Sequence, residues 1–226
     1  MAAQTAEIMR LRTQIGQMQR RTAHADALSV PEALAPLFPS GGLRPGAAYS
    51  LVDSPSLLFA LAGRSSREGA WCAFIGMPDL SLEAATGYGV DPARVALIPR
   101  PGDRWLQAVS SATEVFPLVA VRPPRAATSA ETARLGARLR DRGSALLAVG
   151  PWDGAESSLS VSDPAWGGIS RGHGLISFRA VTVTASGRGA SRPRRVRVLL
   201  PGPSGSAEAH STGTAASRPH LVAVGE

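Results

Sequence analysis

The sequence predicts an α/β protein built on a mainly parallel, twisted sheet, with helices on both faces and antiparallel strands at its edge. Short apolar runs alternate with segments of helical periodicity from Ala47 to about residue 149. Such alternation is typical of βαβ units, in which helices cover both faces of a parallel sheet. Beyond residue 173, two segments with period-two alternation predict an antiparallel strand pair.

The individual elements follow from the same patterns. Five apolar runs are expected to form buried strands: 48–52, 71–75, 95–98, 117–121 and 145–149. Four segments between them are expected to form helices: near 55–66, 81–87, 103–115 and 129–142. The antiparallel pair is expected over 174–184 and 194–200.

The remaining segments predict loops. Residues 150–172 are rich in Gly, Ser and Asp and are expected to form a long loop. Residues 202–219 are mostly Gly, Ser, Ala, Thr and Pro, a composition that predicts disorder. The apolar end, 221–224, is expected either to fray or to add a strand to a partner.

The N-terminal segment predicts an amphipathic helix over 5–21. Its apolar positions recur at spacings of three, four and three residues: Ile8, Leu11, Ile15 and Met18. Four prolines and two adjacent glycines follow and predict a linker. The chain therefore divides into an N-terminal helix (1–24), a linker (25–46), a core (47–202) and a disordered tail (203–226).

The composition excludes several classes of function. All 24 basic residues are arginine, which excludes a Schiff-base lysine and a phosphate-loop lysine. The single cysteine, Cys72, excludes an internal disulfide and a cysteine-rich zinc site. No run approaches the roughly 20 apolar residues of a membrane span, and no signal pattern opens the chain. We therefore expect a cytoplasmic protein without membrane contact.

The net charge of +7 has two explanations. A basic surface is suited to contact with nucleic acid or with an acidic protein partner. A GC-rich genome would produce the same arginine bias without any binding function.

The first strand–helix turn of a parallel α/β sheet is where a phosphate loop is expected. Such a loop needs glycines for close backbone approach, a lysine for the β- and γ-phosphates and a hydroxyl for magnesium. The turn after the 48–52 strand has neither glycine nor lysine and places Asp53 where anions would lie. It is expected to repel phosphate.

Several segments around this turn resemble the RecA core. The segment 41–63 is similar to the Gly-Gly-Leu turn, strand and phosphate-loop helix that open that core, and 67–75 is very similar to the segment that forms its next strand. Residues 89–97 continue the same register, and 174–178 and 195–198 resemble the closing edge strands. The resemblance covers about residues 38–200 and implies a RecA-like fold.

The departures from RecA concern the residues that hydrolyse ATP. RecA has a water-activating acidic residue about three positions after the 71–75 strand, where this chain has Pro78, with Asp79 one residue late. RecA ends its next central strand with a magnesium-binding aspartate, where this chain has Arg122. Since the phosphate loop is also missing, we expect no catalytic residues, no metal and no cofactor.

A RecA-like core without an ATP site resembles the ImuA family, specifically the shortened, SulA-related form called ImuA-prime. That resemblance implies a non-catalytic accessory protein of DNA-damage-induced mutagenesis and translesion synthesis. Its implied partners are RecA, the polymerase-like protein ImuB and, indirectly, an error-prone replicative-type DNA polymerase. It also implies a cytoplasmic protein that joins the nucleoid after DNA damage.

The N-terminal helix is the candidate partner-binding element. RecA protomers join through an N-terminal helix that docks on the neighbouring core, so the stripe of Ile8, Leu11, Ile15 and Met18 is a candidate contact for such a partner. The alternative is that this stripe packs on the chain's own core. Both interpretations stay open at the level of the sequence.

A second candidate site is the densest basic cluster of the chain: Arg192, Arg194, Arg195 and Arg197. It could contact phosphates, or it could keep an edge strand soluble, which is the favoured interpretation. Direct DNA contact through the 150–172 loop is not expected, because Asp153, Glu156 and Asp163 lie there. Two other functions remain: a SulA-type inhibitor of cell division, and a direct DNA-binding protein with salt-sensitive affinity.

Overall fold

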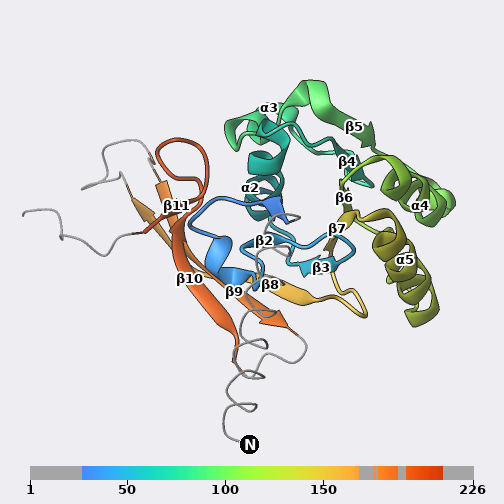
Figure 1. Cartoon of the computed structure of the whole chain (residues 1–226). Helices are drawn as coiled ribbons and strands as arrows, with labels where there is room; N and C mark the ends of the chain where they lie inside the picture. The colour runs from blue at the N-terminus through green and yellow to red at the C-terminus, as the bar shows by residue number, and fades with distance from the viewer. Residues whose placement is uncertain (1–26, 168–175, 177, 188–191, 211–226) are drawn as a thin grey trace, which may run out of the picture.

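The structure, a computed structural model, describes residues 27–167, 176, 178–187 and 192–210 (Figure 1). The helix predicted over 5–21 and the apolar segment 221–224 lie outside the described residues. Within the described part, the architecture is the predicted one: a large sheet, parallel at its centre and antiparallel toward one edge, with helices on both faces.

Nine strands form the main sheet in the order β11-β10-β9-β8-β3-β7-β6-β4-β5. The parallel half contains β3 (Ala48–Leu51), β4 (Cys72–Ile75), β5 (Val95–Ile98), β6 (Leu118–Val121) and β7 (Ala145–Val149). The other half contains β8 (Ser157–Gly167), β9 (Phe178–Gly187), β10 (Arg194–Leu199) and β11 (Glu208–Ala209). β8 runs parallel to β3, and the pairs β8–β9, β9–β10 and β10–β11 are antiparallel.

Four α-helices were predicted in the described region, and four are found there. They are α2 (Pro55–Arg67), α3 (Leu82–Gly87), α4 (Trp105–Val115) and α5 (Ser129–Arg142). Three single 3-10 turns accompany them: η1 (Ala35–Leu37), η2 (Pro92–Arg94) and η3 (Gly102–Arg104). Two polar residues, Ser54 and Thr128, cap α2 and α5 by accepting backbone N–H groups of the first turn.

The cap of α5 is a reciprocal one. Thr128 accepts the N–H of Glu131, and the Glu131 carboxylate accepts the N–H of Thr128 at 2.8 Å. Hydrogen bonds from Arg125 are the main reason that the pKa of Glu131 falls to about 2. The helix ends at Gly143, whose φ of 67° lies in the left-handed region that glycine adopts at little cost.

The sheet separates two hydrophobic clusters. Residues from α2, α3 and the segment before β3 pack on one face, and α4 and α5 pack on the other. Side chains of a strand alternate between the faces, so in β3 Tyr49 and Leu51 join the first cluster, whereas Ala48 joins the second. The α4–α5 layer lies over the parallel half of the sheet, away from β8–β10 (Figure 1).

The linker predicted over 25–46 is wrong for the described part of that range. Residues 27–46 contain η1 and a small antiparallel ladder between β1 (Leu28–Ser29) and β2 (Gly42–Leu43). Five of their apolar side chains are buried in the first cluster: Val30, Leu34, Leu37, Phe38 and Leu43. The prolines therefore mark tight turns of a core segment, not a flexible connection.

The long loop predicted over 150–172 is also wrong, because β8 begins at Ser157. Leu159 and Val161 pack toward the first cluster, and the serines that alternate with them, Ser158, Ser160 and Ser162, are exposed. A register shift between Ser162 and Ala165 marks a bulge, in which Asp163 has a φ of 51°. Bulges of this kind bend a strand and increase its twist without ending it.

The disordered tail predicted from residue 203 is wrong for residues 203–210. β11 pairs with β10, Ala207 is buried, and the Glu208 carboxylate accepts the N–H of Ser204 at 2.7 Å. The predicted tail beyond residue 210 lies outside the described residues.

Ending the chain at Gly202 is expected to lower the melting temperature by roughly 4 to 8 °C. The truncation removes a buried side chain and the β10–β11 hydrogen bonds, together worth about 2 kcal/mol, and each kcal/mol shifts the melting temperature of a domain this size by about 2 to 4 °C. Comparison with a chain ending at His210 isolates the contribution of residues 203–210. Equal melting temperatures for the two truncated chains would contradict the packing of β11.

Candidate functional site

The first candidate site lies where β3, β4 and β6 end, at the carboxyl edge of the parallel strands. β3 passes through Val52 and Asp53 directly into α2, whose first residue is Pro55. The Ser54 hydroxyl accepts the N–H of Leu57 at 3.4 Å. One of the free N–H groups at the helix start is therefore already used, and Pro55 has no N–H to offer.

The Asp53 carboxylate forms an ion pair with the Arg122 guanidinium, which follows β6. The parallel register places β4 between β5 and β6, and the backbone N–H of Arg122 donates to Ile75 of β4 at 2.9 Å. Nε of Arg122 is buried and has no partner among the described residues. Asp53, which would repel phosphate, and Arg122, which would repel magnesium, therefore neutralise each other across the site.

The end of β4 completes this edge. Gly76 follows the strand with a φ of 76°, and a Cβ there would lie 2.3 Å from the carbonyl oxygen of Arg122. Close packing of the two chain segments therefore requires glycine at this position. Met77 is buried, whereas Pro78 and Asp79 are exposed.

A RecA-like fold implies a site for ATP and magnesium. The residues at this edge of the sheet fit neither ligand. The turn holds a carboxylate at the position of the phosphates and a guanidinium at the position of the metal. A hollow of about 720 Å³ lies beside the ion pair, bounded also by Ser50, Val149 and Trp152. Its polar groups can hold a small polar ligand or a partner's side chain, but they do not form a phosphate cradle.

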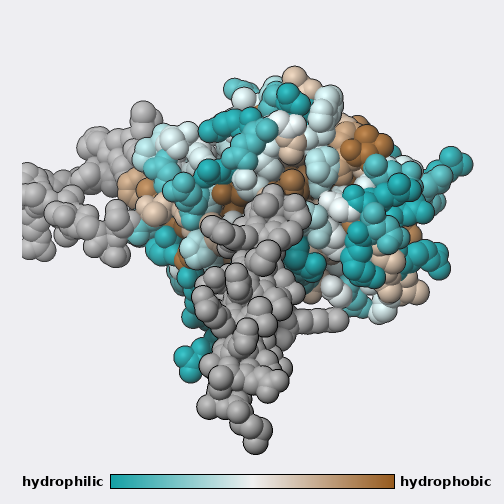
Figure 2. Space-filling model, in the orientation of Figure 1, coloured by the Kyte–Doolittle hydropathy of each residue, from teal (hydrophilic) through white to brown (hydrophobic). Residues whose placement is uncertain are grey.

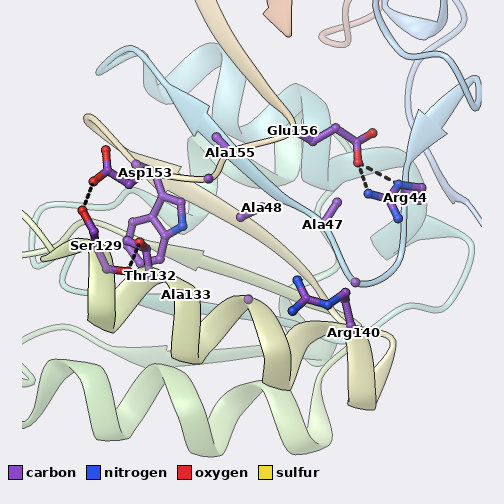
Figure 3. Close-up of a pocket in the computed structure, with 14 residues that line it drawn as sticks. Arg44, Ala47, Ala48, Ser129, Thr132, Ala133, Arg140, Asp153, Ala155 and Glu156 are labelled. Atoms are coloured by element: carbon purple, nitrogen blue, oxygen red, sulfur yellow. Dashed lines mark hydrogen bonds and ion pairs between the residues drawn. The ribbon is translucent and has the colours of Figure 1, made fainter. Parts of the chain in front are cut away.

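A second hollow, a groove of about 680 Å³, runs between α5, the start of β3 and the β7–β8 connection (Figure 3). Small residues form much of its wall: Gly46, Ala47, Ala48, Ala133, Gly136, Gly154 and Ala155. Arg44, Glu156 and Arg140 lie toward one end of the groove, and Ser129 and Asp153 lie toward the other.

Polar contacts fix both ends of the groove. Arg44 donates to Glu156, with Nε 2.7 Å from Oε2, and this hydrogen bond is the main reason that the pKa of Arg44 is raised. The hydroxyl of Tyr49 accepts the backbone N–H of Arg44, and burial raises the pKa of this tyrosine. Ser129 Oγ donates to Asp153 Oδ2 at 2.6 Å.

Exposed apolar side chains gather at the β5 edge of the sheet. Leu97 and Ile98 of β5 are 40% and 36% exposed, and no described strand pairs with the outer edge of β5. Figure 2 shows a hydrophobic patch where β5 lies in Figure 1. Close to the start of β4 and β6, the half-exposed ring of Trp71 lies 6.4 Å from that of Phe116. Such an edge is a template for a strand of another chain.

The structure separates the predicted site residues. Ile8, Leu11, Ile15 and Met18 lie outside the described residues, and their role stays a prediction. The basic cluster divides, because the side chains of β10 alternate between the two faces of the sheet. Nη1 of Arg194 donates to the Pro36 carbonyl on the η1 face at 3.4 Å. Nη1 of Arg197 donates to Thr182 Oγ1 on the opposite face at 3.3 Å.

Arg195 lies two residues from Arg197 and shares its face, and Arg192 is exposed just before the strand. Sequence reasoning treated these arginines as one cluster. It missed the α5 groove, for which no local pattern exists, and it missed the faces of β8, for which the alternation of Ser158, Leu159 and Ser160 was a usable signal.

None of the described helices is long and apolar enough to cross a membrane. Across the same part of the chain, no three His, Cys, Asp or Glu side chains gather in a group that could hold a metal ion. Cys72 is buried in β4, and burial raises the pKa of its thiol to about 12, far from the range of a reactive thiolate.

Comparison with known proteins places this geometry in a family. The structure of the RadB recombinase is similar, with a TM-score of 0.57 at 15% identity, over 81% of this chain and 99% of that one. An uncharacterized protein of Mycobacterium tuberculosis, Rv3395c, is 30% identical over 169 residues, which cover 70% of this chain and 82% of that protein. The likeness to the RadB structure shows a RecA-like fold.

The family model of the MT3502 N-terminal domain matches residues 36–154, from η1 into the β7–β8 connection. This match takes in the carboxyl-edge ion pair and nearly all of the α5 groove, and it spans just over half of the chain. The chain belongs to the MT3502 N-terminal domain family.

Proposed function

We propose that this protein is a non-catalytic adaptor of DNA-damage-induced mutagenesis. It joins RecA to ImuB and, through ImuB, to an error-prone DNA polymerase. In this role it works in the cytoplasm and joins the nucleoid after DNA damage. The proposal combines the RecA-like fold with the resemblance of the sequence to the ImuA family.

The observation that carries the non-catalytic part is the ion pair between Asp53 and Arg122. Phosphoryl transfer by a RecA-like site depends on positioned cations around the phosphates. Here the Arg122 guanidinium at the ends of β3 and β6 is neutralised by the Asp53 carboxylate, which would itself repel phosphate.

The exposed surfaces support the binding part. An adaptor needs more than one partner surface, and the described residues offer the unpaired edge of β5 and the α5 groove. The edge exposes Leu97 and Ile98 together with the free backbone groups of a strand. These two surfaces lie on different parts of the sheet, so two partners can bind at the same time.

The direct test measures binding of the purified protein to RecA, to ImuB and to the division tubulin homologue by pull-down and calorimetry. We expect complexes with RecA and ImuB and none with the tubulin homologue. Binding to the tubulin homologue alone would instead favour a SulA-type inhibitor. A crosslinking map of the complex would then assign each partner to a surface.

The protein is expected to show no saturable binding of ATP, with or without magnesium. Arg122→Asp is expected to remain without ATP turnover, because this substitution restores an acidic residue but no phosphate loop. Calorimetry with millimolar ATP and a phosphate-release assay check both statements. Micromolar affinity that depends on magnesium, or turnover by Arg122→Asp, would show that the nucleotide site lies elsewhere.

A further inference from the structure

The register of β8, β9 and β10 collects hydroxyl side chains on one face of the sheet. Directly paired residues share a face, and they pair hydroxyl with hydroxyl across β8 and β9. We call this surface the hydroxyl face, and it consists of Ser158 with Ser186, Ser160 with Thr184, and Ser162 with Thr182. Ser50 of β3, which pairs with Ser158, continues the first of these rows toward the hollow beside the Asp53–Arg122 ion pair.

The hydroxyl face is open among the described residues. The α4–α5 layer covers β7, β6 and β4 on this side, and none of the described helices extends over β8–β10 on the same side. The four serines of the face are exposed and the two threonines are half-buried. Within the described part, Ser158, Ser160, Thr184 and Ser186 donate no side-chain hydrogen bond to another residue, so their hydroxyls are available to a ligand.

Arginines form the outer row of the same face. Arg195 pairs with Thr184, and Arg197 pairs with Thr182, so each guanidinium extends a row of hydroxyls. Arg195 is exposed, whereas Arg197 reaches over Thr182 and also donates to the backbone oxygen of Asp163. Asp163 is the single acidic residue of β8–β10, and its carboxylate accepts the hydroxyl of Ser162 at 2.9 Å.

This combination differs from an ordinary solvated strand. Exposed strands usually carry long charged side chains, which keep other molecules away from the backbone. Short hydroxyls instead leave a flat surface of hydrogen-bond donors, bordered by fixed positive charge. No apolar side chain stands in the rows to receive a hydrophobic partner, and both aromatic residues of these strands, Trp166 and Phe178, lie beyond the bulge.

We propose that the hydroxyl face binds the phosphate backbone of duplex DNA. Serine, threonine and arginine side chains are regular donors to phosphate oxygens, and such contacts position a protein without reading sequence. Hydroxyls two residues apart on a strand repeat about every 6.8 Å, which suits successive phosphates along one strand. A face without aromatic rings offers no platform for unstacked bases, so duplex is favoured over single-stranded DNA.

This binding site goes beyond the adaptor proposal and does not depend on it. It lies on the antiparallel half of the sheet. The strands β3, β7, β6 and β4 separate it from the β5 edge. An adaptor with this face could hold DNA while its other surfaces hold proteins. If the protein binds neither RecA nor ImuB, the DNA-binding proposal can still be correct. If it binds no DNA, the adaptor proposal can still be correct.

The test is fluorescence anisotropy with a labelled duplex of about 20 base pairs, at 50 and 200 mM salt. Arg195→Glu and Ser160→Glu each place a carboxylate on the hydroxyl face and are expected to lower affinity at least tenfold. Arg195→Ala is expected to reduce the slope of log affinity against log salt by about 0.9, the value for one lost phosphate contact. Ser160→Ala, which removes only a hydroxyl, is expected to cost a few-fold.

Arg100→Glu is the matched control. Arg100 is an exposed arginine that follows β5 at the opposite edge of the sheet, and its substitution changes the net charge by the same amount as Arg195→Glu. Its affinity for duplex is expected to stay within about twofold to threefold of the parent protein. Equal losses for Arg100→Glu and Arg195→Glu would overturn the proposal, because binding would then follow net charge alone.

Three further outcomes would also overturn it. The first is no detectable duplex binding by the parent protein at 50 mM salt. The second is a tenfold preference for single-stranded DNA of the same length. The third is loss of RecA or ImuB binding in Ser160→Glu with duplex affinity unchanged, which would make this face a protein contact. Melting temperatures of all variants identify any that fail to fold, and Ser160→Ala and Arg195→Ala keep the test decisive in that case.

Discussion

Replacing Phe38 with alanine is expected to lower the free energy of unfolding by about 3 to 5 kcal/mol. Phe38 is 3% exposed and contacts the ring of Tyr49 edge-on, with the ring centroids 5.6 Å apart. Alanine would leave a cavity under β3 and remove this aromatic pair, which adds about 0.5 to 1.5 kcal/mol beyond burial. The size of the effect follows from the packing of residues 27–46 as part of the core.

Urea unfolding followed by circular dichroism measures the change. Val115→Ala serves as the control, because the Val115 side chain is 73% exposed and its truncation is expected to cost less than about 0.5 kcal/mol. If Phe38→Ala lost no more stability than Val115→Ala, residues 27–46 would act as the linker that their prolines and glycines suggested.

The parallel half of the fold was predictable from local sequence. Strands buried on both faces are continuous apolar runs, and β4 and β7 carry such runs over Cys72–Ile75 and Ala145–Val149. The helices between them have polar caps and one apolar stripe each, which are also local signals. For these elements the predicted and observed bounds differ by no more than two residues.

The errors occur where burial depends on partners that are distant in the sequence. Leu34 and Phe38 stand among prolines and glycines, and nothing local shows that both are buried in the first cluster. β8 was hidden by its composition, because serine and glycine suggest a loop. The alternation of exposed serines with Leu159 and Val161 indicates a strand, but the loop prediction gave more weight to composition.

The candidate sites also combine features that are local in the sequence with features that depend on distant residues. The chemical types of Asp53 and Arg122 were readable one at a time, but they are 69 residues apart and their ion pair depends on the order of β3, β7, β6 and β4. The split of the basic cluster into two faces required the register of β10 against β9. Since one residue of slippage reverses every face, register is information that composition cannot supply.

Leu11→Asp and Ile15→Asp are each expected to lower affinity for a protein partner about a hundredfold or more. A charge placed in the centre of an apolar contact costs several kcal/mol, and each 1.4 kcal/mol is a factor of ten in affinity. RecA is the first partner to test, because the resemblance to RecA implies docking through an N-terminal helix. The prediction rests on the spacing of Ile8, Leu11, Ile15 and Met18 in the sequence.

The two interpretations of this stripe predict opposite pairs of measurements on the same variants. If the stripe faces a partner, the melting temperature of the isolated protein stays unchanged while affinity for RecA or ImuB falls. If the stripe packs on the chain's own core, the same aspartates cost a few kcal/mol of stability. Gln17→Asp, on the face of the predicted helix away from the stripe, is the matched control and is expected to change neither quantity. A large loss of stability in Leu11→Asp and Ile15→Asp would eliminate docking through this helix. Unchanged stability with unchanged affinity for both partners would remove the helix from the adaptor's binding surfaces and leave the β5 edge and the α5 groove as its contacts.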